Sequence, residues 1–484
     1  MRRRAGLALG LGLLAVALRI LVGRGLVNYD TLYTLVWGRD LAHGHVPDVE
    51  LALAPTPHPL ATLIAALLSP LSSLQLDGIH GEAGASAAVG IAFLSLATLG
   101  VVVFRLGAAW FNPAAGLLAA VIVLTRQPVL DFGARAYVDI PYLTLVLGAV
   151  LAETRRRRAG GPVLLLLGLA GLLRPEAWLF AAAYWIYLWR SPGEAPRPRA
   201  NLVRLAALAA AAPLLWALSD VLVTGNPLHS LTGTRATADT LRRVTGLHSV
   251  PGTVPRRLGE ILREPVLLGA AGGGVMSLLW LGDRRHVRVG AAVGVASLVA
   301  FGVLAAAGLP ILGRYLLLPA TILALFCGAG AFGWMELPRD QGRRRQVWAA
   351  FAAVTALALL AFTPQQVRRI EDLRNALRIQ ESIQGDLADA VRGPERGGRE
   401  CRPISVPNFR PVPLLALWLD EPVGTFVSLQ ERTPASGLYL APSSPAVARQ
   451  YVLDRRDLRQ SVSPVPAGFR QSARFGAWRT YRTC

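Results

Sequence analysis

The chain has 484 residues, of which 53% are hydrophobic, and its mean hydropathy of +0.43 is too high for an ordinary soluble protein. Its formal net charge is +20, and all of its 50 basic residues are arginines. A charge of this size can indicate nucleic-acid binding, but these arginines cluster in short loops between apolar segments, as in the cytoplasmic loops of membrane proteins. We therefore predict a polytopic α-helical membrane protein without a nucleic-acid partner.

The first apolar segment covers residues 5–26 and follows three arginines at positions 2–4. About 20 apolar residues suffice for a transmembrane helix, and arginines are enriched on the cytoplasmic side. No small-residue cleavage site followed by a soluble domain is found, so we interpret the segment as an uncleaved span. The N-terminus is then cytoplasmic, and the protein lies in the plasma membrane.

The first outer loop covers residues 27–83 in this topology. Residues 31–42 repeat apolar side chains at helical spacing, which predicts a helix lying in the membrane interface. A second short apolar stretch, residues 58–70, is bounded by prolines and predicts another interfacial helix. Asp30 directly precedes the first of these helices, so we predict an active site that faces lipid.

Further apolar segments alternate with polar loops as far as residue 362. They cover residues 84–104, 114–124, 140–151, 162–173, 178–189, 205–223, 266–281, 289–307, 311–334 and 347–362. Together with the first segment they predict about eleven transmembrane helices, with the arginine-rich loops inside. Residues 1–363 form the predicted transmembrane domain, in which residues 224–264 are a long outer loop.

The composition changes after this domain. Residues 364–398 are typical of an amphipathic helix and a linker, and residues 399–484 of a small extracytoplasmic α/β domain. Strands are predicted at residues 425–429, 437–440 and 476–482, and a helix at residues 413–419.

Two of the three cysteines, Cys401 and Cys484, bracket the small domain. Disulfides persist outside the cytoplasm, so this topology predicts a bridge between them. If residues 436–444 pair with residues 470–482, the strands carry Cys484 back toward Cys401. Cys327 lies in an apolar run and is predicted to be inert.

Ionisable residues gather at the predicted outer ends of the spans. These residues, with one neighbouring tyrosine, are Asp30, His58, Arg135, Asp139, Arg174, Glu176, Arg314 and Tyr315. Such groups are costly beside a bilayer and usually face a cavity or a partner, although any one could instead be wetted by lipid headgroups. Isolated outer arginines oppose the positive-inside bias, so Arg174 and Arg314 are candidates for binding an anion, most simply a lipid phosphate.

The order of these features resembles the GT-C superfamily of membrane glycosyltransferases, in particular its bacterial protein O-mannosyltransferase and aminoarabinose transferase branch. The resemblance covers roughly residues 5–335 and rests on Asn28-Tyr-Asp-Thr31, Arg135-Ala-Tyr-Val-Asp139, Leu-Leu-Arg174-Pro-Glu176 and Gly-Arg314-Tyr315. It implies a polyprenyl-phosphate-linked sugar donor, an acceptor on the outer face, Asp30 as catalytic base, and Asp139 as the acid of the second outer loop. The family often has two acids at the first position. Only one matches here, so no cofactor is expected to be required, and a divalent metal is possible but not indicated.

The predicted reaction is an inverting transfer of a sugar to a hydroxyl of a glycan or protein acceptor. A carboxylate near the hydroxyl proton assists the attack, and cations stabilise the charge that grows on the departing phosphate. Asp30 has the first role, and Arg174 and Arg314 have the second. His58 is predicted to contact the acceptor or the phosphate. Two further histidines of this loop, His43 and His45, lack the helical spacing of metal ligands.

Two other classes of protein fit the composition. A transporter or lipid flippase should show repeat symmetry and polar breaks near the middle of its spans, and we find neither. A non-enzymatic protein of envelope assembly would explain the small C-terminal domain but not the acids and arginines at the loop corners. The identity of the sugar, the lipid length and the acceptor are not encoded in any motif that we recognise.

Overall fold

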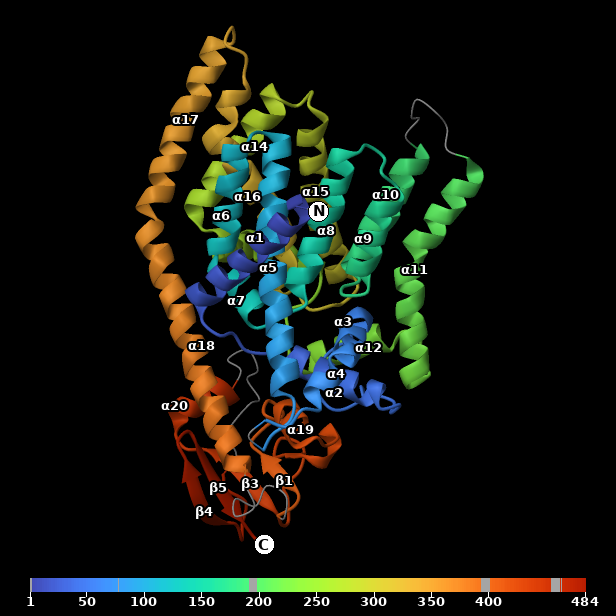
Figure 1. The fold of residues 1–484 in the computed structure, drawn as a ribbon, viewed down its shortest axis with the longest axis vertical. Helices are drawn as coiled ribbons and strands as arrows, with labels where there is room; N and C mark the ends of the chain where they lie inside the picture. The colour runs from blue at the N-terminus through green and yellow to red at the C-terminus, as the bar shows by residue number, and fades with distance from the viewer. Residues whose placement is uncertain (1, 77, 191–197, 393–400, 454–461, 463) are drawn as a thin grey trace.

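The computed structural model describes residues 2–76, 78–190, 198–392, 401–453, 462 and 464–484. The predicted linker at residues 393–398 lies outside this range. The molecule is elongated, with a bundle of long helices at one end and a small β-sheet at the other (Figure 1). Four shorter helices lie between these two parts: α2 (Tyr29–Ala42), α3 (Pro59–Leu67), α4 (Ser69–Ser72) and α12 (His229–Thr240).

The bundle consists mainly of apolar helices. They are α1 (Arg2–Val22), α5 (Glu82–Trp110), α6 (Pro113–Thr125), α7 (Gln127–Ala134), α8 (Asp139–Arg155), α9 (Gly161–Gly171), α10 (Glu176–Arg190), α11 (Arg199–Thr224), α13 (Val250–Leu262), α14 (Glu264–Trp280), α15 (Arg285–Ala306), α16 (Leu317–Phe332) and α17 (Gly342–Ala361). Short 3-10 turns η1 (Leu247–Ser249), η2 (Gly313–Leu316) and η3 (Gly333–Glu336) join some of them. Leucine, valine and alanine side chains of these helices form one continuous core.

Five helices of the described part are long and apolar enough to cross a membrane, or up to eight spans if each of three bent helix pairs counts as one. This indicates a multi-pass helical membrane protein, and the number of eleven spans stays a prediction. Part of the difference between the eleven predicted spans and these five to eight comes from three predicted segments, residues 140–151, 162–173 and 178–189. These form helices α8, α9 and α10 of 17, 11 and 15 residues, shorter than the about 20 residues of a typical transmembrane helix.

Helix α2, which the sequence predicts as an interfacial helix, is largely buried within the protein. Eight consecutive residues, from Leu32 to Arg39, are buried, so its apolar side chains contact protein on most sides. Its position in the membrane interface stays a prediction. The apolar residues share a core with helix α19 (Val412–Leu419) of the C-terminal unit. The Arg39 guanidinium donates to the carbonyl oxygen of Ala416 at 3.1 Å and pairs with Asp420 at 3.0 Å. The first outer loop and the C-terminal unit are therefore packed as one body.

The C-terminal unit, residues 401–484, contains a five-stranded sheet in the order β2-β1-β3-β5-β4. Its strands are β1 (Ile404–Val406), β2 (Val427–Ser428), β3 (Leu438–Pro442), β4 (Arg470–Phe475) and β5 (Trp478–Arg482), and it also has the 3-10 turn η5 (Val423–Thr425), the one-turn helix α20 (Pro445–Val447) and the π-helical turn η6 (Ala448–Val452). Strand β1 is parallel to β2 and β3, and β5 is antiparallel to β3 and β4. The predicted pairing of residues 436–444 with 470–482 is found as the β3–β5 ladder.

Helix α18 (Thr363–Val391) connects the bundle to this unit, as Figure 1 shows. It begins directly after α17 at a bend of 41° and places its last turns against β5. There the indole of Trp478 donates to the carbonyl oxygen of Ile383 at 2.9 Å, and the amide of Ala477 donates to the Asp386 carboxylate at 2.8 Å. These contacts fix the sheet to the end of the helix.

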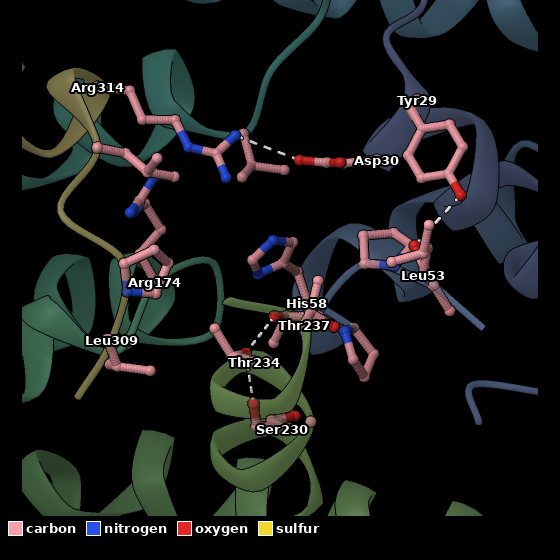
Figure 2. Close-up of a pocket in the computed structure, with 18 of the residues that line it drawn as sticks. Tyr29, Asp30, Leu53, His58, Arg174, Ser230, Thr234, Thr237, Leu309 and Arg314 are labelled. Atoms are coloured by element: carbon pink, nitrogen blue, oxygen red, sulfur yellow. Dashed lines mark hydrogen bonds and ion pairs between the residues drawn. The ribbon is translucent and has the colours of Figure 1, made fainter. Parts of the chain in front are cut away.

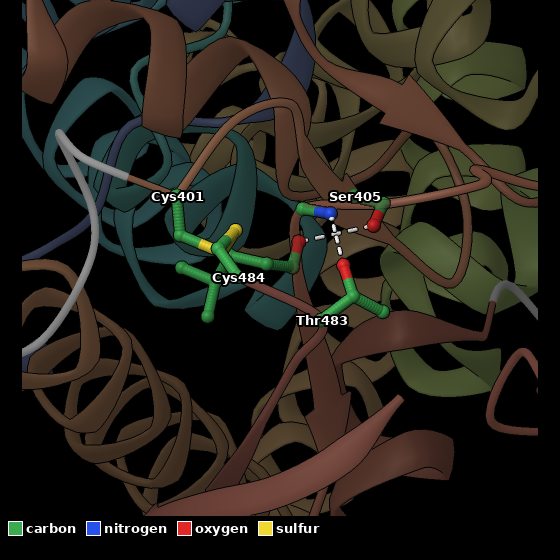
Figure 3. The surroundings of a disulfide bond; sticks show 6 residues. Cys401, Ser405, Thr483 and Cys484 are labelled. Carbon is green, nitrogen blue, oxygen red and sulfur yellow. Dashed lines mark hydrogen bonds between the residues drawn. A yellow bond between two sulfur atoms is a disulfide. The ribbon is translucent and has the colours of Figure 1, made fainter. Parts of the chain in front are cut away.

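Cys401 and Cys484 form a disulfide that joins the first and last described residues of the unit (Figure 3). Next to it, Thr483 accepts a hydrogen bond from the amide of Gly437, and the Ser405 hydroxyl donates to the carbonyl oxygen of Leu438. The bridge therefore joins the segment before β1 to the segment after β5, across the intervening strand β3.

We predict that replacing both Cys401 and Cys484 by serine destabilises the C-terminal unit by roughly 4 kcal/mol, because the bridge closes a long loop. The two cysteines are 83 positions apart in the sequence. Hydrogen exchange of the β3 and β5 amides measures the change, and non-reducing peptide mapping of the parent detects the linked peptide. Two free thiols that label only after the membrane is permeabilised would contradict both the bridge and the outer location of this unit.

Candidate active site

Asp30 lies in the first turn of α2, and the residue that precedes the helix, Asn28, fixes that turn. The Asn28 side chain caps the helix by accepting hydrogen bonds from the amides of Asp30 (2.8 Å) and Thr31 (3.2 Å). The Asn28 amide group also donates to the carbonyl oxygen of Arg135 at 2.8 Å, and the Thr31 hydroxyl donates to that of Ala136 at 2.8 Å. The start of α2 is thereby tied to the corner between α7 and α8.

A series of alternating charges starts at Asp30. Its Oδ2 accepts a hydrogen bond of 3.2 Å from Nη1 of Arg314, which lies in η2 at the start of α16. The same nitrogen is 3.9 Å from Oδ2 of Asp139 in the first turn of α8. Oδ1 of Asp139 accepts a hydrogen bond from Arg174, and Arg174 also donates to Glu176 at 2.7 Å. Four loop corners that are far apart in the sequence thus meet.

Tyrosine rings pack against the two guanidinium groups. The Cζ atom of Arg174 is 4.1 Å from the ring centre of Tyr315, and that of Arg314 is 5.5 Å from the ring centre of Tyr137. Cations over aromatic faces are attracted by the ring quadrupole. These rings therefore hold the planes of the guanidinium groups in addition to the carboxylates.

The two arginines differ in the donors that they have left. All three nitrogens of the Arg174 guanidinium donate to Asp139 or Glu176, and both acids are buried. Arg314 donates to Asp30 through one nitrogen, while its Nε is buried and has no hydrogen-bond partner among the described residues. Arg314 is therefore the cation better able to accept an anionic ligand.

A cavity of about 1690 Å³ lies at this series of charges. Asp30, Arg174, Glu176, Arg314 and Tyr315 line it. Asp139 does not line it, since this carboxylate is 2% exposed and lies behind the arginines. Figure 2 shows Asp30 and Arg314 pointing toward each other, with Arg174 beside Arg314 and His58 below them.

His58 also lines the cavity, at the N-terminus of α3. Its ring meets Trp216 edge to face at 5.9 Å, and its Nδ1 is buried without a hydrogen-bond partner among the described residues. Burial, with a smaller contribution from the charge of Arg174, lowers the pKa of His58 from 6.5 to about 4. The imidazole is therefore neutral at pH 7 and adds no positive charge to the site.

Arg135 lines the cavity but does not join the series of charges. Its Nε donates to Asp131 at 2.6 Å, one turn earlier in α7, and its Nη1 donates to the side chain of Gln380 in α18. The predicted Arg135-x-x-x-Asp139 pattern therefore separates in space into an arginine that contacts α18 and an acid that holds Arg174.

The sequence analysis did not anticipate two walls of the cavity. One is the polar face of α12, with Ser230, Thr234 and Thr237, seen in the lower part of Figure 2. The other belongs to the C-terminal unit, which contributes Arg410 and Tyr451. Nothing in the local sequence marks these residues, because only the packing of the C-terminal unit onto the first outer loop brings the second wall to the cavity.

No group of three or more histidine, cysteine, aspartate or glutamate side chains with the spacing of a metal site is found in the described part of the chain. The ring of His43 contacts its own helix, since its Nδ1 is 2.8 Å from the carbonyl oxygen of Arg39.

We predict that Arg174→Ala strongly destabilises the protein, by about 3–5 kcal/mol, because the buried carboxylates of Asp139 and Glu176 lose their partner. The control is Arg256→Ala, since the Arg256 side chain is 75% exposed and its pair with Glu260 is worth at most about 1 kcal/mol. Thermal unfolding of both purified variants in one detergent measures the effect. Equal melting temperatures for the two variants would show that the buried pair is not a structural constraint.

No family model matches the chain, and no curated protein does. Among solved structures, the aminoarabinose transferase ArnT from Cupriavidus metallidurans bound to undecaprenyl phosphate is similar, with a TM-score of 0.57 and 13% sequence identity over 99% of this chain and 98% of that chain. Its apo state gives a TM-score of 0.57 at 14% identity, covering 100% of this chain and 99% of that chain.

The apo oligosaccharyltransferase from Archaeoglobus fulgidus gives a TM-score of 0.50 at 13% identity, over 86% of this chain and 63% of that chain. Both neighbours are GT-C membrane glycosyltransferases. At such low identity the likeness concerns the fold, and at that level it confirms the predicted resemblance. The chain therefore has the fold of the GT-C membrane glycosyltransferases.

Proposed function

We propose that this protein is an inverting glycosyltransferase that moves a sugar from a polyprenyl-phosphate-linked donor to an acceptor hydroxyl. The observation that carries the proposal is the contact between Asp30 and Arg314 in the cavity. It brings together a carboxylate that can take a proton and a cation that can receive a phosphate. The fold supports the proposal, because it is shared with an aminoarabinose transferase solved with undecaprenyl phosphate.

Asp30 is the proposed catalytic base. Its Oδ2 is held by Arg314, whereas Oδ1 accepts no hydrogen bond from the described residues, and the side chain is 30% exposed. The acceptor hydroxyl would donate to Oδ1 while its oxygen attacks the anomeric carbon. The new glycosidic bond forms as the bond from that carbon to the phosphate oxygen breaks, and the proton moves to Asp30. A single displacement of this kind inverts the anomeric configuration.

Arg314 is the proposed phosphate ligand. The departing polyprenyl phosphate keeps the electron pair of the broken bond, so negative charge grows on its oxygens. Arg314 lines the cavity and donates to Asp30 through Nη1 alone, so the rest of its guanidinium can turn its N–H groups toward these oxygens. One guanidinium would thus fix the distance between the base and the leaving group, which is the geometric requirement of the displacement.

The other predicted residues have supporting roles in this proposal. Arg174 stabilises the leaving group from a greater distance and, with Asp139 and Glu176, holds the position of Arg314 and Tyr315. Neutral His58 offers a ring nitrogen to a substrate hydroxyl, and Arg135 contributes positive charge to the rim.

We further propose that the reaction requires no divalent metal. Asp30 and Asp139 both face the guanidinium of Arg314, which already provides a cation between them. Transfer by the purified protein should therefore be the same in EDTA as in buffer with Mg²⁺ or Mn²⁺. Loss of transfer in EDTA that is restored by one of these metals would refute this point.

The proposed location is the plasma membrane, with about eleven spans, a cytoplasmic N-terminus and an extracytoplasmic C-terminus. The cavity then opens on the outer face, where a lipid-linked donor and a glycan or protein acceptor can meet. A flippase would move the donor without cleaving it, so release of polyprenyl phosphate separates the enzyme from a transporter.

The test of the proposed function is transfer from a panel of polyprenyl-phosphate sugars by the parent protein and by Asp30→Asn. We expect Asp30→Asn to lose about 10²–10⁴-fold in rate, because an amide cannot accept the proton. The control is Asp131→Asn, since Asp131 is also 30% exposed and paired with an arginine but does not line the cavity. Full activity in Asp30→Asn would exclude this residue as the base.

Arg314→Ala should slow transfer by about 10²–10³-fold and weaken binding of undecaprenyl phosphate, because the phosphate loses its closest cation. Arg392→Ala is the matched control, since its side chain is 26% exposed against 21% for Arg314 and it pairs with acids outside the cavity. Rates and lipid affinities are measured in the same nanodiscs. Unchanged lipid affinity in Arg314→Ala would place the phosphate elsewhere.

A further inference from the structure

The wall that the C-terminal unit contributes to the cavity is built at the ends of its parallel strands. The segment after β1 supplies Phe409 and Arg410, and the segment after β2 supplies residues 429–431. These two strands are parallel and adjacent, so both segments leave the sheet at the same edge. Ligands of open α/β sheets commonly bind at the carboxyl ends of parallel strands. This wall of the cavity therefore lies at the edge of the sheet where ligands of such sheets commonly bind.

Arg410 is the positive charge of this wall. Within the described residues it forms no ion pair, and its guanidinium lies over the ring of Tyr451, whose centre is 5.9 Å from Cζ. Burial raises the pKa of the Tyr29 hydroxyl, and Arg410 opposes that rise, so the guanidinium acts on the residue next to Asp30 in sequence. Glu431 also lines the wall, but it is exposed and forms no ion pair with Arg410.

The backbone around Arg410 is fixed. Asn408 is completely buried, its Oδ1 accepts from the amide of Arg410 at 3.0 Å, and its Nδ2 donates to the carbonyl oxygen of Val452 at 2.7 Å. This one side chain joins the segment after β1 to the turn η6 that carries Tyr451. The arginine and the tyrosine are therefore held in a constant relative position, as a preorganised site requires.

Amide side chains complete the surface. Gln380 and Gln384 of α18 and Gln430 line the same cavity, and the Oε1 of Gln430 is buried without a hydrogen-bond partner among the described residues. A guanidinium binds a carboxylate or phosphate with paired hydrogen bonds, tyrosine rings offer flat faces, and amides bind hydroxyl groups. An acidic sugar offers a carboxylate or phosphate to the guanidinium, a ring face to the tyrosine and hydroxyl groups to the amides.

We propose that Arg410, with Tyr451 and Gln430, forms an acceptor subsite that recognises an anionic sugar residue of a glycan acceptor. The subsite lies on the C-terminal unit, opposite in the fold to the bundle that supplies Arg174 and Arg314. This proposal rests on the proposed transferase function for the identity of the bound glycan as an acceptor. The binding site itself can be tested without transfer.

The experiment uses the full-length protein in nanodiscs containing saturating undecaprenyl phosphate, so that Arg314 is occupied by the lipid. Ligand-observed NMR then gives the affinities of methyl β-D-glucoside, methyl β-D-glucuronide and methyl β-D-glucoside 6-phosphate. We expect the parent to bind at least one of the anionic probes at least about tenfold more tightly than the neutral one, as for a charge-assisted hydrogen bond. The anionic probe that binds more tightly identifies carboxylate or phosphate as the recognised group.

Arg410→Gln should remove this preference, and Arg410→Lys should reduce it while keeping part of it, because lysine retains the charge but not the paired donors. Arg432→Gln is the control, since Arg432 is exposed on the same unit and does not line the cavity. If Arg410→Gln does not fold, Arg410→Lys and the parent still decide the matter.

Equal affinities for all three probes in the parent would overturn the proposal. So would an unchanged preference in the Arg410 variants, an equal loss in Arg432→Gln, or a preference seen only with an acidic peptide such as acetyl-Glu-Glu. Failure of the transferase proposal is detected separately, as absent donor cleavage and absent binding of undecaprenyl phosphate, neither of which depends on the anionic probes.

Discussion

The buried pairing of Arg174 with Asp139 and Glu176 is the constraint on which the site depends. These acids are 2% and 6% exposed, so removing the arginine would leave two buried charges without compensation. The pair fixes the corner after α9 to the first turns of α8 and α10. Arg314, next to Asp139, then has a defined position, and through Arg314 so does Asp30.

Helix α2 connects these charged residues to the C-terminal unit. Its first turn carries Asp30, and the rest of the helix shares a hydrophobic core with the C-terminal unit. Arg39 joins the two by hydrogen bonds to α19. The proposed base and the wall that contains Arg410 therefore belong to one packed body, while the proposed phosphate ligand belongs to the bundle. The cavity lies where the two meet, so both parts contribute to any substrate bound in it.

Much of the candidate site could be predicted from single residues, because a charge beside an apolar segment needs a partner wherever it occurs. That argument selected Asp30, Asp139, Arg174, Glu176 and Arg314, which the structure brings together. The same argument also selected Arg135, which does not join these charges, because its partners are Asp131 and a glutamine 245 positions away.

Other features required the tertiary structure. Helical periodicity predicts an apolar face for α2 but does not identify the elements that pack on it, and α19 is one of them. The residues Arg410 and Tyr451 lie in short turns without any periodic pattern, and only long-range packing places them at the cavity. Counting the spans also requires the tertiary structure, since short helices such as α9 resemble spans in composition alone.

The most direct test of the central claim is an experimental structure of the protein with undecaprenyl phosphate. The account predicts the phosphate within hydrogen-bonding distance of Arg314, with Asp30 still bound to that guanidinium through Oδ2 and with Oδ1 facing the cavity. A phosphate bound away from Arg314, or an Asp30 turned out of the cavity in the lipid complex, would contradict the proposed arrangement of base and leaving group.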